Sequence, residues 1–100
     1  MIVLANLKED VRPEDYERWV RETYSPTIMK LESVDDWRGY RIGNLLESDS
    51  APPYQYVVEV EIKDLAQLGE DMSGEEVQRL LAELQGFVEP PVQLMTERFV

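Results

Sequence analysis

The sequence contains no cysteine and no histidine. Without cysteine the chain has no disulfide, no thiolate nucleophile and no thiolate metal ligand. Without histidine it has no imidazole base, no Ser–His–Asp triad and no histidine-ligated zinc, iron or copper. An enzyme built from this chain would therefore transfer protons with Asp, Glu, Lys, Tyr or water.

Three further features are scarce or missing. The five glycines stand apart, so there is no glycine-rich phosphate loop. Only 10 Lys and Arg stand against 21 Asp and Glu, and the resulting net charge of −11 disfavours nucleic acid and anionic lipid as partners. No apolar run approaches the roughly 20 residues that span a bilayer, and the N-terminal MIVLANLKED lacks the basic start of a signal peptide. We therefore expect a cytoplasmic protein that binds neither nucleic acid nor membranes.

What the sequence does contain is the pattern of one globular domain over residues 1–100, with 43% apolar residues. Apolar and alternating runs predict four strands, at 1–7, from about 34, at 52–62 and at 92–100. Helical spacing predicts helices at 13–24 and 73–86, with one more helical turn at 27–31 and a short helix or turn at 63–72. The order βαββαβ predicts an α+β, ferredoxin-like subunit, with both main helices on one side of an antiparallel sheet.

Helix ends are marked by several local signals. Pro13 suits the first position of its helix, and Pro26 predicts a break or kink. Ser73 with Glu76 forms a capping-box pattern, and Gly86 is placed to end the helix. Within the second strand, Gly39 suggests a bulge or the close approach of another group.

The strand PPYQYVVEVEI (52–62) predicts its own orientation. Tyr56 and Val58 belong to an apolar set of alternating residues, whereas Glu59 and Glu61 belong to the opposite set. We expect the apolar set to face the helices, because the two carboxylates would be costly against leucines. The helical stripe that needs this apolar partner is made of Val77, Leu80, Leu81 and Leu84.

The other face of the sheet has no helix to cover it. Neither face of the first and last strands is clearly polar, so the uncovered face predicts contact with a second sheet. A homodimer that buries two sheets face to face is the simplest arrangement.

Five segments, in order, resemble the RedY-like family, also called HapK-like. They are NLKEDVRPEDYERW (6–19), SPTIMKLESV (25–34), YRIGNLL (40–46), PPYQYVVEVEIKDL (52–65) and ELQGFVEPPVQL (83–94). The family's members are encoded in pathways for prodiginines and related pyrrole or indole natural products. The resemblance implies a homodimeric α/β barrel without metal, flavin or heme. The chain departs from it at Arg12, where a small polar helix cap is expected.

The dimeric barrel implies a ligand pocket between sheet and helices. Several residues could bind an aromatic heterocycle there, although the aromatic ones could instead be ordinary core residues. An inward Arg41 or Arg38 would bind a substrate acid or one of the strand glutamates, and Asn6 either orients a ligand or simply ends its strand. The candidate substrate-binding residues are Asn6, Tyr16, Trp19, Trp37, Tyr40, Arg41 and Tyr54.

Glu59, Glu61 and Tyr56 are the candidate catalytic residues, since an enclosed carboxylate has a raised pKa and can serve as acid or base. The alternative is that both glutamates are solvated surface residues. The sequence therefore favours a small cofactor-independent enzyme that acts by acid/base chemistry, in dehydration, decarboxylation, hydrolysis or tautomerisation. Two alternatives stay open: a non-catalytic protein that shields or delivers the intermediate, and a cofactor-free monooxygenase.

Overall fold

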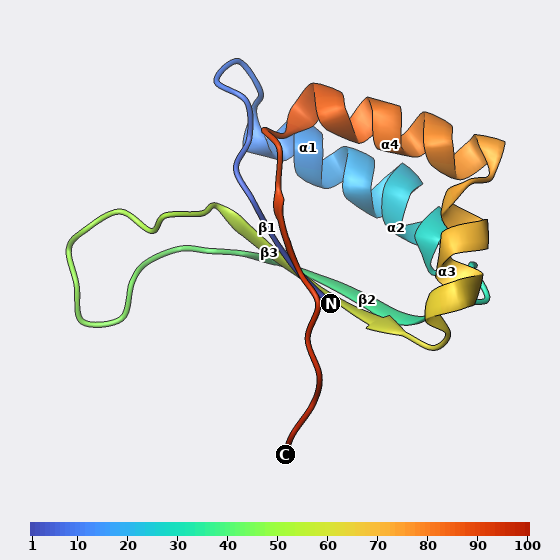
Figure 1. Ribbon diagram of the computed structural model, residues 1–100. Coiled ribbons are helices and arrows are strands. Elements are labelled where there is room, and N and C mark those ends of the chain that lie inside the picture. The colour runs from blue at the N-terminus through green and yellow to red at the C-terminus, as the bar shows by residue number, and fades with distance from the viewer.

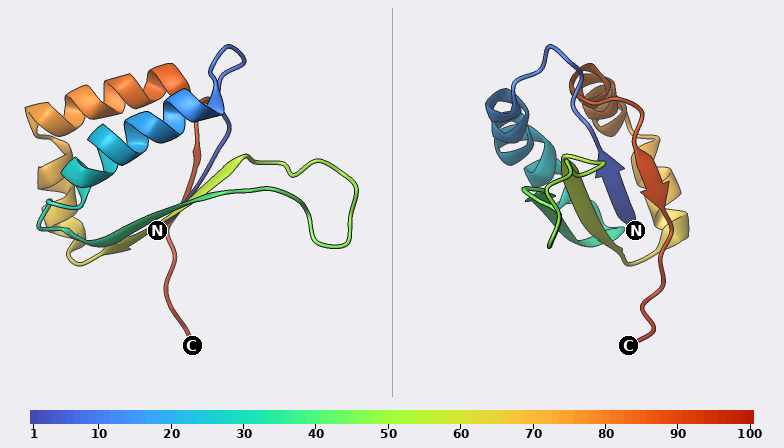
Figure 2. Two further views of the ribbon diagram at one scale, coloured as in Figure 1. Left: turned by 180° about the vertical axis from the view of Figure 1, so that it is seen from behind. Right: turned by 90° about the vertical axis from the view of Figure 1, so that its left-hand side faces the viewer.

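The computed structural model describes residues 1–100 and shows an α+β fold of two layers (Figure 1). One layer is a four-stranded antiparallel sheet of order β2-β3-β1-β4. Its strands are β1 (Ile2–Ala5), β2 (Val34–Arg41), β3 (Tyr56–Ile62) and β4 (Val92–Leu94). The helices are α1 (Pro13–Trp19), the π-helical turn η1 (Val20–Tyr24), α2 (Ser25–Ile28), α3 (Leu65–Met72) and α4 (Glu75–Phe87). Helices α1 and α4 lie side by side over one face of the sheet (Figure 2), which confirms the predicted ferredoxin-like subunit.

The orientation predicted for the third strand is confirmed. Tyr56 and Val58 are buried toward the helices, while Glu59 and Glu61 are exposed on the opposite face. Val58 packs in one core cluster with Val77 of α4, as the apolar stripe of that helix requires. Burial of this apolar set fixes which side of the sheet can carry a pocket under the helices.

Of the break or kink expected at Pro26, the break does not occur, and the helix that begins at Pro13 runs on to Ile28. The turn that precedes the proline widens instead into η1, in which the Ser25 N–H donates to the Val20 carbonyl. Proline offers no N–H to the carbonyl four residues earlier and its ring crowds that carbonyl. A π-helical turn at this point accommodates the proline while the chain stays helical.

The helix predicted at 73–86 is α4, but the two signals predicted to mark its ends are wrong. Ser73 caps the end of α3, where its hydroxyl donates to the Glu70 carbonyl, so it does not form a capping box with Glu76. Gly74 is the N-cap of α4 and offers no side chain to the helix. Gly86 lies inside the helix, which ends when Val88 turns to extended backbone and forms a bridge with Leu7. Tertiary pairing therefore ended this helix, rather than the glycine.

Strands β3 and β4 are shorter than predicted. Strand β3 begins at Tyr56, and residues 42–55 form a long loop that projects from the body of the protein (Figure 1). Strand β4 ends at Leu94, and the segment 95–100 runs away from the sheet. The register places Ile2 beside Leu94 and Leu4 beside Val92. These apolar side chains lie on the sheet face opposite the helices, and Val92 and Leu94 are exposed.

None of the helices combines the length and hydrophobicity that a bilayer crossing requires.

Candidate functional site

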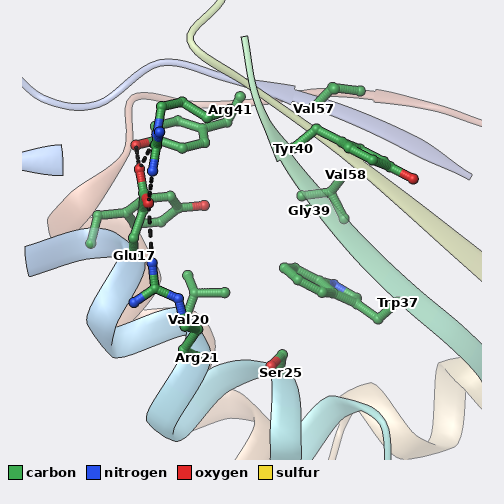
Figure 3. A pocket seen from close by; sticks show the side chains of 12 residues that line it. Glu17, Val20, Arg21, Ser25, Trp37, Gly39, Tyr40, Arg41, Val57 and Val58 are labelled. Carbon is green, nitrogen blue, oxygen red and sulfur yellow. Dashed lines mark hydrogen bonds and ion pairs between the residues drawn. The ribbon is translucent and has the colours of Figure 1, made fainter. Parts of the chain in front are cut away.

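A cleft of about 440 Å³ opens between the first helix and the edge of the sheet (Figure 3). Its helical wall comes from α1, η1 and the start of α2, and its sheet wall comes from β2 and β3. The π-helical turn therefore contributes directly to the wall, in keeping with the frequent occurrence of such turns at functional sites. The lining residues are Tyr16, Glu17, Val20, Arg21, Ser25, Trp37, Gly39, Tyr40, Arg41, Tyr56, Val57 and Val58.

Glu17 is the centre of a hydrogen-bonded network in this cleft. The Tyr56 hydroxyl donates to Glu17 Oε2 at 2.7 Å, and Arg41 Nε donates to the same oxygen at 2.6 Å. Arg41 Nη2 donates to Glu17 Oε1, which Arg21 Nη2 also reaches at 3.3 Å. Arg41 therefore holds Glu17 in a two-pronged pair, the strongest geometry between a guanidinium and a carboxylate. The network joins α1 to β2 and β3.

The network fixes the protonation states of its members. The hydrogen bond from Arg41 is the main cause that lowers the pKa of Glu17 to about 2, against the opposing effect of burial. Burial and then the Glu17 carboxylate raise the pKa of Tyr56 above its ordinary value. Glu17 is consequently ionised at neutral pH, and Tyr56 keeps its proton and acts as a donor.

Aromatic rings surround the network. Tyr16 meets Tyr56 edge to face, with ring centroids 4.9 Å apart, and burial raises the pKa of Tyr16 to about 12. Trp37 extends from β2 across the cleft toward the helix, and its ring meets Tyr24 edge to face at 6.0 Å. A Cβ added to Gly39 would lie 3.2 Å from the Trp37 ring, so Gly39 provides the close approach suggested by the sequence. The irregular register of β2 lies elsewhere, between Val34 and Asp36.

A second hollow of about 110 Å³ lies deeper, between the sheet and the helices. Its walls are almost entirely apolar and include Leu81 and Leu84 of α4. Tyr16, Trp37 and Val58 border both this inner hollow and the cleft. The arrangement therefore joins a polar, charged opening to an apolar interior through an aromatic wall.

Four of the candidate site residues come together in the cleft with their side chains, namely Tyr16, Trp37, Arg41 and Tyr56. Tyr40 borders the cleft, but it alternates with Gly39 and Arg41 along β2, so its side chain points to the opposite face of the sheet. Arg41 is the arginine of β2 that faces the helices. Arg38 lies on the opposite face, where it donates to Asp36 of the same strand and stands across from Glu59.

Asn6, Trp19 and Tyr54 lie outside the cleft. The Asn6 amide donates to the Pro53 carbonyl at 3.1 Å and accepts from the Gln55 N–H at 2.9 Å, which ties the projecting loop to β1. The Trp19 ring stacks on Tyr24, with centroids 5.2 Å apart, and its Nε1 donates to Glu83 of α4. Tyr54 precedes β3 and does not line either hollow.

Glu59 and Glu61 also lie outside the cleft, exposed on the sheet face that the helices leave open. The carboxylate that does line the cleft is Glu17, which the sequence analysis did not single out. Its position carries a weak signal, because it stands three residues before Val20 and seven before Tyr24 on the helix. That spacing places Glu17 at the border of the apolar face, beneath which the sheet lies.

No group of three or more Asp and Glu side chains is arranged to hold a metal ion. The chemistry that the cleft offers comes from one carboxylate, two guanidiniums and the two buried phenols of Tyr16 and Tyr56. Together these groups can bind a polar substituent, donate a proton and, once the carboxylate is freed, accept one.

Comparison with known proteins agrees with this architecture. The chain is similar to HapK from Hahella chejuensis, with 21% identity over 99% of this chain and 95% of that one, and a TM-score of 0.72. An Arabidopsis thaliana protein matches with a TM-score of 0.74 and 14% identity, covering 99% and 96%. A dimeric ferredoxin-like protein of unknown function from Thermobifida fusca matches with a TM-score of 0.68 and 14% identity, covering 91% and 81%. The TM-scores establish a shared fold.

No curated protein sequence matches the chain at a significant level. The family model described as REDY-like protein HapK matches residues 1–99, which is nearly the whole chain. The resemblance noted in the sequence is thereby confirmed, and the chain belongs to the REDY-like HapK family.

Proposed function

We propose that this protein is a small, cofactor-independent enzyme of secondary metabolism that acts on a pyrrole- or indole-derived intermediate by proton transfer. The observation that carries the proposal is the Tyr56–Glu17–Arg41 network, held in the wall of an aromatic-lined cleft. An ionised carboxylate and a protonated phenol within hydrogen-bonding distance form an acid/base pair without histidine.

In this proposal Glu17 is the base and Tyr56 is the proton donor. Glu17 accepts a proton from an N–H or C–H of the heterocycle, and Tyr56 holds the carboxylate in place at 2.7 Å. Return of a proton at another ring position completes a tautomerisation. Its delivery to a hydroxyl substituent completes a dehydration, in which water leaves. Neither reaction needs an additional oxidant or reductant.

The ring itself would lie against Trp37 and Tyr16, which border both hollows. A flat aromatic ligand gains apolar contact area and favourable ring geometry against such side chains. The inner hollow, of about 110 Å³, would take a small apolar substituent of that ring. Glu59 and Glu61 have no part in this mechanism, because they lie on the other face of the sheet.

The experiment is incubation of the purified protein with bipyrrole and indole intermediates, with and without oxygen, followed by product analysis. Turnover without oxygen is the expected result, and it would exclude the monooxygenase alternative. Glu17→Gln and Tyr56→Phe should each lower turnover by about 100-fold or more, as loss of an acid/base group does. Arg38→Gln is the matched control, since Arg38 lies on the same strand but on the opposite face. Equal turnover in Glu17→Gln and wild type would refute the assigned base.

One observation favours the alternative of a non-catalytic binding protein. Glu17 is already fully engaged by two arginines and a tyrosine, so the resting site holds no base with a pKa near neutrality. In this alternative the network has a structural role alone: it fixes the helix on the sheet and shapes the cleft. Tight binding of an intermediate without turnover, in any oxygen condition, would decide for this alternative.

We further propose that two copies of the chain associate through the open sheet face. Support comes from its apolar row of Ile2, Leu4, Val92 and Leu94, since exposed patches of this kind mark association surfaces. The dimeric description of the Thermobifida fusca relative also supports it.

Sedimentation of the wild-type protein should give the mass of two chains, and sedimentation of Leu94→Lys should give the mass of one. Glu59→Gln and Glu61→Gln should leave the subunit folded and alter the dimerisation constant. A wild-type mass of one chain at micromolar concentration would rule out the dimer.

A further inference from the structure

The rim of the cleft carries a local excess of positive charge in a strongly acidic protein. The chain has a net charge of −11, yet two arginines converge on the single carboxylate of Glu17. The side chain of Glu17 is 16% exposed, whereas those of Arg41 and Arg21 are 66% and 70% exposed. The carboxylate therefore lies inside, and the guanidiniums present their outer edges to the solvent.

Most hydrogen-bond donors of these two guanidiniums remain free. Each guanidinium carries five N–H donors. Arg41 uses Nε and Nη2 on Glu17, and Arg21 uses only Nη2. Figure 3 shows the two arginines on opposite sides of Glu17, at the same opening that Trp37 faces. An anion at this opening would meet donors from both arginines and an aromatic surface beside them.

We propose that the ligand of the cleft is an aromatic carboxylate, whose carboxylate group binds Arg41 and Arg21 in competition with Glu17. The inference rests on the proposed function, and it specifies the substrate class of the same site. A planar carboxylate matches the fork of a guanidinium, while a neutral amide of the same shape cannot form the ion pair. The aromatic part of the ligand then lies where Trp37 and Tyr16 line the cleft.

Competition of this kind links binding to the state of Glu17. The bond from Arg41 is the main cause of the low pKa of the Glu17 carboxyl. A ligand anion that takes over Arg41 removes this cause and adds a negative charge nearby, and both changes favour protonation of Glu17. In the free protein the base, Glu17, is held in an ion pair with Arg41. Binding of the substrate carboxylate to Arg41 breaks this pair and frees Glu17. This exchange reconciles the fully engaged Glu17 with a catalytic role.

The test is calorimetric titration of the intact protein with indole-2-carboxylate and indole-2-carboxamide, which share ring and shape but differ in charge. The carboxylate should bind about tenfold more tightly or better, the factor that a charge-assisted hydrogen bond provides. Arg41→Gln and Arg21→Gln should each reduce this preference, and Arg38→Gln should preserve it. Glu17→Gln should tighten carboxylate binding, because the internal competitor is gone. Circular dichroism checks that each variant is folded, and Arg21→Gln tests the proposal even where Glu17→Gln does not fold.

The outcomes separate this inference from the proposed function. Equal affinity for the two probes would overturn the carboxylate assignment and leave the aromatic cleft in place. A carboxylate preference that survives in both arginine variants would also overturn it, because the anion would then bind elsewhere. Binding of neither probe would count against the inference and the proposed cleft together.

Discussion

Replacement of Tyr56 by phenylalanine isolates the contribution of one hydroxyl to the site. The substitution keeps the ring, which packs edge to face on Tyr16, and removes only the donor to Glu17 at 2.7 Å. Tyr56 is 6% exposed, so water does not replace the lost bond freely. The variant should therefore keep the fold and lose the hydrogen bond alone.

The expected magnitude follows from the type of bond. Hydrogen bonds to charged groups contribute about 1.5–3 kcal/mol to the free energy of unfolding. Glu17 retains Arg41 and Arg21 in the variant, so its charge is not left unpaired and the lower end applies, about 1.5 kcal/mol. For an m-value of about 1.5 kcal/mol/M this is a shift of roughly 1 M in the urea midpoint.

The assay is urea unfolding followed by circular dichroism, at one fixed protein concentration because association stabilises the folded state. Tyr54→Phe is the matched control, since the Tyr54 hydroxyl forms no hydrogen bond within the protein and lies outside both hollows.

The pH dependence of the free energy of unfolding gives a second check. The raised pKa of Tyr56 makes it a source of stability below pH 10 that is lost as the pH rises further, and Tyr56→Phe removes that contribution. A Tyr56→Phe midpoint equal to that of wild type would refute the network as described.

Three further predictions test other parts of the structure. The folded-state pKa of Glu17 is lowered from 4.5 to about 2, so its contribution to stability is complete above pH 4.5 and is lost as the pH falls toward 2. In acid titration, the free energy of unfolding of Glu17→Gln should therefore fall less steeply than that of the wild type. Gly39→Ala should push the Trp37 ring by a few tenths of an ångström, changing its fluorescence and weakening ligand binding, whereas Gly43→Ala, with nothing within 4 Å of the added Cβ, should change neither. Leu80→Ala should lower the free energy of unfolding by about 2–5 kcal/mol, because that side chain is only 2% exposed; a loss below about 1 kcal/mol in urea would contradict its place in the core.

The sequence by itself determined the order of the elements and the orientation of the sheet. The alternation of Tyr56 and Val58 with Glu59 and Glu61 allows only one side to face the helices, because a one-residue shift would bury both carboxylates. Propensity and pattern are local properties, so the positions of the main helices also followed from the sequence. Local signals failed at the ends of α4, because Ser73 caps the end of α3 and Gly86 remains inside the helix. At the C-terminal end of α4, the pairing of Val88 with Leu7 prevailed over the helix-ending preference of the glycine.

Only the tertiary structure decided which side chains form the site. Glu17 and Tyr56 are 39 residues apart in the chain, and Glu17 and Arg41 are 24 apart, so no local pattern relates them. The same holds for the choice between Arg41 and Arg38, which depends on the register of β2 against β3. The strand glutamates stood out in the sequence because they interrupt an apolar run, while Glu17 stood among other charged residues of a helix. A carboxylate's chemistry is set by the groups packed around it, and the folding of α1 onto the sheet edge brings those groups together.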